Sequence, residues 1–359
     1  MTKRRFRDYG FSVGKLPMGR LNSITDVPGV AVGHVTLNKN LEGNCVRTGV
    51  TAILPHPGNP FREKAVGAAY VINGFGKTTG LVQVNELGTL ESPIMLTNTF
   101  SVPAATEGAL KFMMELDEGI GGQDGSLNVV TGECNDKLLN DMRGLHVRPE
   151  HAMEAIRQAK AGQPVAEGAV GAGTGMVCFG YKGGIGTSSR QITVDGIVYH
   201  FGVLVLTNYG KGEDLTILGK PVGAFLNQPM IERGNNDGSI IIVVGTDLPL
   251  DSRQLQRIAK RAGIGLARTG SIAHHGSGDI VIAFSNGSLI PHSPDTGFIT
   301  LKCIREDGPL MSECFRAAAD ATEEAIYNSL FMSETTTGRG GSVVRSLPVE
   351  DVLAYLRSR

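Results

Sequence analysis

Residues 238–245 restrict the fold of this chain more than any other segment. Five consecutive β-branched apolar residues, Ile240-Ile241-Ile242-Val243-Val244, are typical of a fully buried strand. The polar run Asn235-Asn236-Asp237-Gly238 comes directly before them and favours a turn. Ser239 therefore stands at the mouth of a buried strand, in a sheet whose faces we expect helices to cover.

The Gly238-Ser239 junction has the layout of a bond that the chain can cut by itself. Glycine has no Cβ to obstruct attack on its carbonyl carbon. Attack by the Ser239 hydroxyl would give an ester that water hydrolyses, leaving a new N-terminal serine. The α-amine of that serine, with a pKa near ~8, is a suitable base for its hydroxyl. The same residues also fit a plain loop that enters a core strand, with Ser239 as a polar cap.

Composition excludes several classes of function. The chain has 359 residues and is 41% hydrophobic, which allows two domains or one large one with a substantial core. Its net charge is −1 without a basic stripe, which argues against nucleic acid as a partner. No stretch of 18 apolar residues exists, and no apolar segment follows the basic N-terminus. We therefore expect neither a membrane span nor a signal peptide.

The five cysteines are odd in number, widely spaced and never in a Cys-x-x-Cys pair. This spacing argues against a disulfide scaffold and against a zinc ribbon, and it favours reduced thiols in a cytoplasmic protein.

Predicted strands and helices come in runs, which is typical of an α+β layered fold with an antiparallel sheet. We expect helices at 101–116, 149–161, 252–268, 313–331 and 349–356. We expect strands at 50–54, 65–72, 127–130, 203–206, 240–244 and 279–284, and a hairpin of 192–194 with 197–199. Asp195-Gly196 is the turn of that hairpin.

Two tempting motifs fail on spacing. The glycines of 74–80 match neither a phosphate loop nor a dinucleotide fingerprint, so a turn after strand 65–72 is favoured. His274-His275 stands outside any metal-binding spacing, and no histidine is marked as the partner of a serine. The α-amine of Ser239 remains the most useful candidate base, and we expect neither metal nor cofactor.

Four other residues are candidates for chemistry. Ser277 and Asp279 lie two apart at a strand start, so they share a face and could polarise Ser239 if the two strands are neighbours. Asn208 ends an apolar strand and could donate to an oxyanion. Glu133, after a Thr-Gly turn, could bind a substrate ammonium. Each also fits a plain structural role as a turn or strand-end residue, and Cys134 more often packs than reacts.

These residues together resemble the L-aminopeptidase/D-alanyl-esterase/amidase family, which includes the β-peptidyl aminopeptidases. The resemblance spans nearly the whole chain and includes Asp237-Gly238-Ser239-Ile240 and Gly276-Ser277-Gly278-Asp279. Its other blocks are 22–30, 32–34, 73–76, 132–133, 171–176, 208–210 and 266–271.

The resemblance implies a four-layer αββα sandwich similar to the N-terminal-nucleophile hydrolases, here one domain over 1–359. It implies a cut at Gly238-Ser239 into chains 1–238 and 239–359. Ser239 would be the nucleophile, with Ser277 and Asp279 beside it, and some members have Glu at the position of Asp279. Asn208 would bind the oxyanion. Glu133 would hold the free amine of a small peptide or amino-acid amide.

The resemblance also implies a homo-oligomer of processed αβ units. It leaves open the preference for L-, D- or β-amino acids and the role of Asn135, which stands where some relatives have Tyr. Two alternatives are an ornithine-acetyltransferase-like enzyme, whose nucleophile would be Thr, and a non-enzymatic glycine-rich binding protein.

Overall fold

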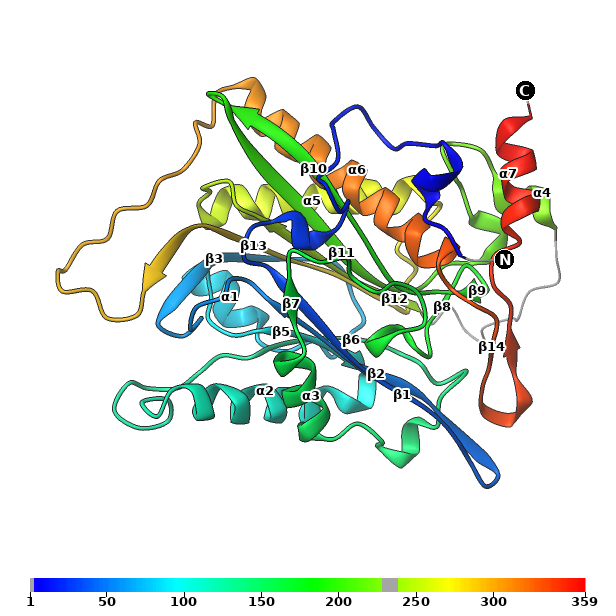
Figure 1. Ribbon diagram of the computed structural model, residues 1–359, viewed down its shortest axis with the longest axis horizontal. Coiled ribbons are helices and arrows are strands. Elements are labelled where there is room, and N and C mark those ends of the chain that lie inside the picture. The colour runs from blue at the N-terminus through cyan, green and yellow to red at the C-terminus, as the bar shows by residue number, and fades with distance from the viewer. Residues whose placement is uncertain (1–2, 228–237, 359) are drawn as a thin grey trace.

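Two sheets lie face to face, and helices cover the outer face of each (Figure 1). The computed structural model describes residues 3–227 and 238–358, so the polar run 235–237 lies outside the described residues. The four-layer αββα architecture that the family resemblance implies is confirmed. β12 (Gly238–Thr246) lies inside the larger sheet, with a neighbouring strand on each side.

Within the described residues the larger sheet has six strands in the order β10-β11-β12-β13-β3-β4. Apart from β12, its strands are β3 (Glu63–Gly74), β4 (Thr89–Leu90), β10 (Gly184–Val194), β11 (Ile197–Asn208) and β13 (Ser277–Pro291). The smaller sheet has the order β6-β5-β2-β1-β7. Its strands are β1 (Ala31–Leu41), β2 (Asn44–Leu54), β5 (Ile94–Asn98), β6 (Val130–Cys134) and β7 (Lys160–Ala161).

Two small hairpins stand outside these sheets. They are β8 (Val177–Cys178) with β9 (Tyr181–Lys182), and β14 (Thr336–Thr337) with β15 (Val343–Val344).

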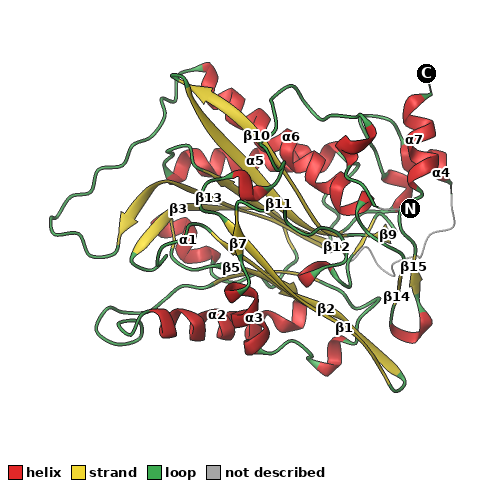
Figure 2. Cartoon of the chain, in the orientation of Figure 1, coloured by secondary structure: helices red, strands yellow, loops and turns green. Residues whose placement is uncertain are grey.

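Two pairs of helices form the two outer layers (Figure 2). α5 (Ser252–Arg268) and α6 (Pro309–Phe331) pack on the larger sheet, and α2 (Val102–Leu116) and α3 (Pro149–Arg157) pack on the smaller one. The others are α1 (Leu81–Leu87), α4 (Val222–Leu226) and α7 (Val349–Arg357). None of the helices in residues 3–227 and 238–358 has the length and hydropathy of a bilayer span.

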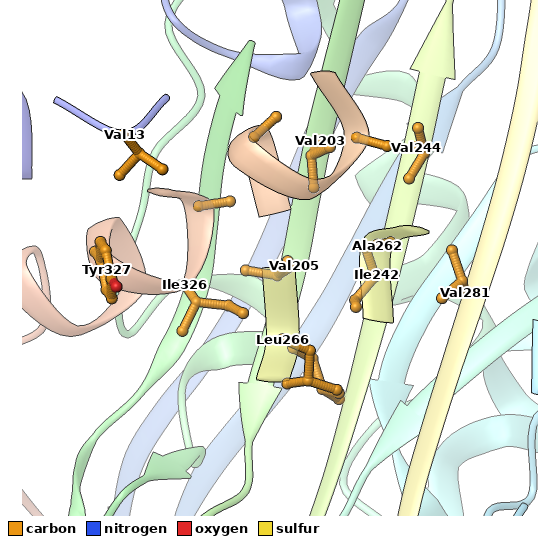
Figure 3. Packing of buried hydrophobic residues seen from close by; sticks show 14 of the residues in the cluster. Val13, Val203, Val205, Ile242, Val244, Ala262, Leu266, Val281, Ile326 and Tyr327 are labelled. Carbon is orange, nitrogen blue, oxygen red and sulfur yellow. The ribbon is translucent and has the colours of Figure 1, made fainter. Parts of the chain in front are cut away.

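β12 is buried on both faces, as its sequence predicts. Ile242 and Val244 point toward α5 and α6, where they meet Ala262 and Leu266 (Figure 3). Ile241 and Val243 point the other way, into the core between the two sheets. Burying a side chain of this size contributes about 1.5–3 kcal/mol, so the strand is firmly held from both sides.

The strand that follows α5 runs parallel to β12, a feature that the sequence pattern did not predict. Most neighbouring strands are antiparallel, as expected, but β12–β13 and β5–β6 are parallel. A parallel pair needs a crossover connection, and α5 provides it between β12 and β13. α5 begins where predicted because the Asp251 side chain accepts from the Gln254 backbone N–H at 2.7 Å.

Several predicted boundaries differ from the structure, and two of the differences change the role of a segment. The strand expected at 127–130 is β6, Val130–Cys134, so Glu133 lies inside a strand and not after a turn. The helix expected at 149–161 ends at Arg157, because residues 160–161 pair with β1 as β7.

The hairpin turn is confirmed. Asp195 and Gly196 have φ values of 50° and 80°, the left-handed conformations that a two-residue hairpin turn requires.

Replacing Ile242 with Ala tests the double burial of β12. The smaller side chain leaves a cavity beneath α5 and α6, and we expect a loss of about 2–5 kcal/mol in the free energy of unfolding. Urea denaturation followed by circular dichroism measures this loss. Ile197→Ala is the matched control, because Ile197 is 55% exposed, and it should cost less than about 1 kcal/mol. Equal losses in both variants would contradict the packing described.

Candidate active site

Three strand ends meet at one edge of the larger sheet and bring the predicted site residues together. β11 ends at Asn208, which pairs with Ser239 at the start of β12. On the other side of β12, Gly238 is level with Ser277, and Ser239 is level with Gly278. The parallel direction of β12 and β13 causes this proximity, since both strands begin at the same edge.

The side chain of Ser239 lies between the two sheets and is only 3% exposed. It shares a strand face with Ile241 and Val243, because side chains alternate along a strand. Cys134, at the end of β6, contacts Ser239 there through a hydrogen bond between their side chains.

Cys134 is held as a neutral thiol. Burial raises the pKa of the Cys134 thiol well above its ordinary value, and the nearby Glu133 carboxylate adds to this rise. Only a thiolate is an effective nucleophile, so the raised pKa disfavours Cys134 in that role.

Ser277 and Asp279 form a buried hydrogen-bonded pair. The Ser277 hydroxyl donates to Asp279 Oδ1 at 2.5 Å. Burial raises the pKa of Asp279 to about 6, although the bond from Ser277 and the backbone N–H of Ile240 oppose this rise. A Cβ added to Gly238 would lie 3.3 Å from Ser277 Oγ, so the Ser277 hydroxyl lies against the residue that precedes Ser239. The shared face of Ser277 and Asp279 is confirmed.

Asn73, at the end of β3, supports this pair from the other side of β13. Its Nδ2 lies 3.0 Å from the carbonyl oxygens of both His274 and His275 and 2.5 Å from that of Ser277. The sequence analysis names Asn73 only as part of a family motif. Its role has no sequence signal, because a side chain that binds distant backbone carbonyls produces no recognisable spacing.

The two adjacent histidines therefore contribute their backbone to the site. His274 Nε2 also lies 3.8 Å from Asp214 Oδ2. Among residues 3–227 and 238–358, no group of three His, Cys, Asp or Glu side chains is arranged to hold a metal ion.

The side-chain amide of Asn208 is fixed at both of its polar atoms. Its Oδ1 accepts from the Val177 backbone N–H at 3.0 Å. Its Nδ2 donates to the Asn135 carbonyl at 2.8 Å. Asn135 thus contributes a backbone acceptor to the site, and its own side chain accepts from the Lys137 backbone N–H.

Glu133 is buried near the same edge. Its Oε1 accepts from the Lys77 backbone N–H at 2.8 Å, and its Oε2 accepts from the Thr99 hydroxyl. A Cβ added to Gly76 would lie 3.5 Å from Glu133 Oε1 and 3.6 Å from the Cα of Gly278. Gly76 therefore lies between the Glu133 carboxylate and the backbone of Gly278. A side chain at position 76 would fill part of the space between these two groups.

The chain is similar to known peptidases over almost its whole length. The model of a family described as Peptidase family S58 matches residues 22–344. The chain is 40% identical to a β-peptidyl aminopeptidase of Sphingosinicella microcystinivorans, covering 98% of this chain and 92% of that protein.

Solved structures are similar over almost the whole chain. A crystallised protein of Pyrococcus horikoshii has a TM-score of 0.93 and 48% identity, with 99% of each chain covered. The L-aminopeptidase D-Ala-esterase/amidase of Ochrobactrum anthropi, described as a prototype serine aminopeptidase and a variant of the Ntn hydrolase fold, has a TM-score of 0.93. Its identity is 34%, with 99% of this chain and 98% of that chain covered.

The raised pKa of Asp279 predicts a pH-dependent effect of Asp279→Asn on stability. The folded-state pKa of about 6 exceeds the ordinary aspartate value of 3.8, so the wild type loses stability as pH rises between these values. The neutral amide avoids this loss. We expect Asp279→Asn to exceed the wild type at pH 8 by on the order of 1–3 kcal/mol, with the advantage disappearing near pH 4.

Chemical denaturation at both pH values measures the difference, with Ser239→Ala present in both proteins so that neither chain is cut. Asp295→Asn, at an exposed position, should leave stability unchanged and serves as the control. An Asp279→Asn variant less stable than the wild type at pH 8 would show that the fold does not raise the pKa of Asp279.

Proposed function

Because the chain belongs to peptidase family S58, we propose that this aminopeptidase uses Ser239 as its nucleophile. Its substrates are small peptides, amino-acid amides or esters with a free N-terminal amine, from which it releases the first residue. The observation that carries the proposal is the strand register, in which Ser239 pairs with Asn208 on one side and with Gly278, beside Ser277, on the other. The serine aminopeptidase of Ochrobactrum anthropi is similar over 99% of this chain, which supports the assignment.

We also propose that the enzyme is made by self-cleavage at Gly238-Ser239. The Ser239 hydroxyl attacks the Gly238 carbonyl carbon, the C–N bond breaks, and the α-amine leaves with a proton. Water then hydrolyses the ester between the two residues to give chains 1–238 and 239–359. The Ser277 hydroxyl lies against Gly238 and is bonded to Asp279, so this pair is well placed to relay a proton.

Turnover repeats this chemistry on a substrate. The α-amine of Ser239 accepts the hydroxyl proton as the oxygen attacks the carbonyl carbon of the first residue. An N–H of the Asn208 amide stabilises the oxyanion that forms. The leaving amine departs with a proton, and water hydrolyses the acyl-enzyme to release the first residue and restore Ser239.

Glu133 explains why the substrate needs a free amine. Its buried carboxylate is held by Lys77 and Thr99 on the far side of Gly76 from the backbone that pairs with Ser239. An ammonium placed there pairs with the carboxylate and fixes the distance from the N-terminus to the attacked carbonyl. A blocked N-terminus leaves the carboxylate unpaired and is bound poorly.

The other interpretations are less well supported. The match to a peptidase family does not favour an acetyltransferase or a non-enzymatic binding protein. The relatives named β-peptidyl aminopeptidases make β-amino-acyl substrates the first to test, beside L- and D-amino-acyl ones. The oligomer of αβ units and the cytoplasmic location stay predictions.

Mass spectrometry of the denatured protein tests self-cleavage and the nucleophile together. The wild type should give two fragments that end at Gly238 and begin at Ser239. Ser239→Ala should give one intact chain without activity, because it lacks the attacking hydroxyl. Ser271→Ala, at a partly exposed position outside the proposed machinery, should be cut and active like the wild type. A cut Ser239→Ala chain, or an uncut wild type with full activity, would refute the mechanism.

Replacing Glu133 with Gln tests the ammonium site. We expect kcat/KM for an amino-acyl ester to fall by about 10- to 100-fold, because the amide cannot neutralise the ammonium. The matched substrate is the ester with a hydroxyl in place of its amine, for which the same substitution should change kcat/KM by less than about threefold. Equal losses on both esters would assign Glu133 a structural role.

A further inference from the structure

A fully buried lysine lies behind the Asn208 amide. Lys182, in β9, has no exposed surface. Its ammonium donates to the carbonyl oxygens of Gly173 at 2.9 Å, Met176 at 2.9 Å and Gly183 at 2.7 Å. Burying an ammonium is costly, and these three acceptors offset part of that cost. The Lys182 ammonium therefore links the glycine-rich turn 173–176 to Gly183, the residue that follows β9.

One peptide group connects this ammonium to the amide of Asn208. The Met176 carbonyl, which accepts from Lys182, belongs to the same planar unit as the Val177 N–H. That N–H donates to Asn208 Oδ1 at 3.0 Å. A rigid plane bonded at both ends cannot rotate without breaking a hydrogen bond, so the ammonium helps to restrain the orientation of the Asn208 side chain.

The backbone around this peptide group is closely packed, and the Gly183 backbone N–H also donates to the Met176 carbonyl at 3.1 Å. β8 and β9 lie beside the ends of β11 and β12 (Figure 1), and Val177 and Lys182 face each other across their hairpin. A Cβ added to Gly183 would lie 2.8 Å from the carbonyl oxygen of Thr207, the residue before Asn208. The side chain of Lys182 therefore approaches the turn 173–176 from the protein interior, beside the end of β11 that carries Asn208.

We infer that Lys182 is a positioning residue for the reaction, which acts through the Met176–Val177 peptide group to aim the Asn208 amide at the oxyanion. The inference rests on the proposed role of Asn208. The ammonium also polarises the peptide group, which strengthens the bond from Val177 to Asn208 Oδ1 and makes the amide N–H groups better donors. Because the oxyanion exists only in the transition state and intermediate, Lys182 affects kcat and leaves KM nearly unchanged.

Lys182→Met is the first variant, since it preserves length and removes the charge and all three donors. We expect kcat per cut chain to fall on the order of 10- to 100-fold, with KM changed by less than about threefold. Lys182→Gln keeps N–H donors without the charge and should fall between this variant and the wild type. It is the variant to measure if Lys182→Met does not fold.

Ser333→Ala is the matched control. The Ser333 hydroxyl donates to the Gly183 carbonyl at 2.8 Å, so it touches one of the same acceptors without reaching the Met176–Val177 peptide group. Its kcat should stay within about twofold of the wild type. A comparable loss in this control would mean that loosening the turn in general, and not the lysine, lowers the rate.

The deciding measurement is a double-mutant cycle with Asn208→Ala. If Lys182 acts through Asn208, adding Lys182→Met to Asn208→Ala causes little further loss of kcat. If the kcat losses of the two single variants multiply in the double variant, the positioning role of Lys182 is overturned while the proposed role of Asn208 stands. An Asn208→Ala variant with wild-type kcat would instead overturn the proposed function of Asn208. Where a variant is cut slowly, its rate is divided by the concentration of cut chain, which mass spectrometry gives.

Discussion

The structure depends on the burial of one strand, β12, between two layers of apolar side chains and two neighbouring strands. Its alternate residues enter the core beneath α5 and α6 and the core between the two sheets. This anchoring fixes the strand's register, because a shift of one residue would exchange its two faces. The position of Ser239 beside Asn208 and Gly278 follows from that register alone, so hydrophobic packing far from the site determines the geometry of the polar residues in it.

The charged groups of the site are held in different ways. Asp279 is buried beside a hydroxyl and a backbone N–H, and its pKa is raised to about 6. Glu133 is buried with a backbone N–H and a hydroxyl as donors. Lys182 has three backbone carbonyls around its ammonium. In each case at least one partner is a backbone group, and nearby glycines let the main chain approach these side chains closely.

Local patterns in the sequence were sufficient for some parts of this description. The apolar run 240–244, the helix 252–268 and the Ser277–Asp279 pair depend on spacings of a few residues, and the structure has all three. Glu133 was placed after a turn because β6 contains polar residues whose partners, Lys77 and Thr99, are distant in the chain. The parallel pairing of β12 with β13 has no local signal. The four layers and the roles of the site residues were expected from family resemblance, and not from periodicity.

The strand order has a consequence for how the molecule would come apart after a cut at Gly238-Ser239. Residues from 239 onward supply β12, β13, α5 and α6, whereas β11 and β3 on either side of that strand pair come from residues before 238. The two products would therefore be interleaved within one sheet. Their separation would require breaking the hydrogen bonds of both strand pairs, β11–β12 and β13–β3, which amounts to unfolding. Reassembly would then be a second-order reaction, so recovery from denaturation would depend on protein concentration in a way that the uncut chain would not share.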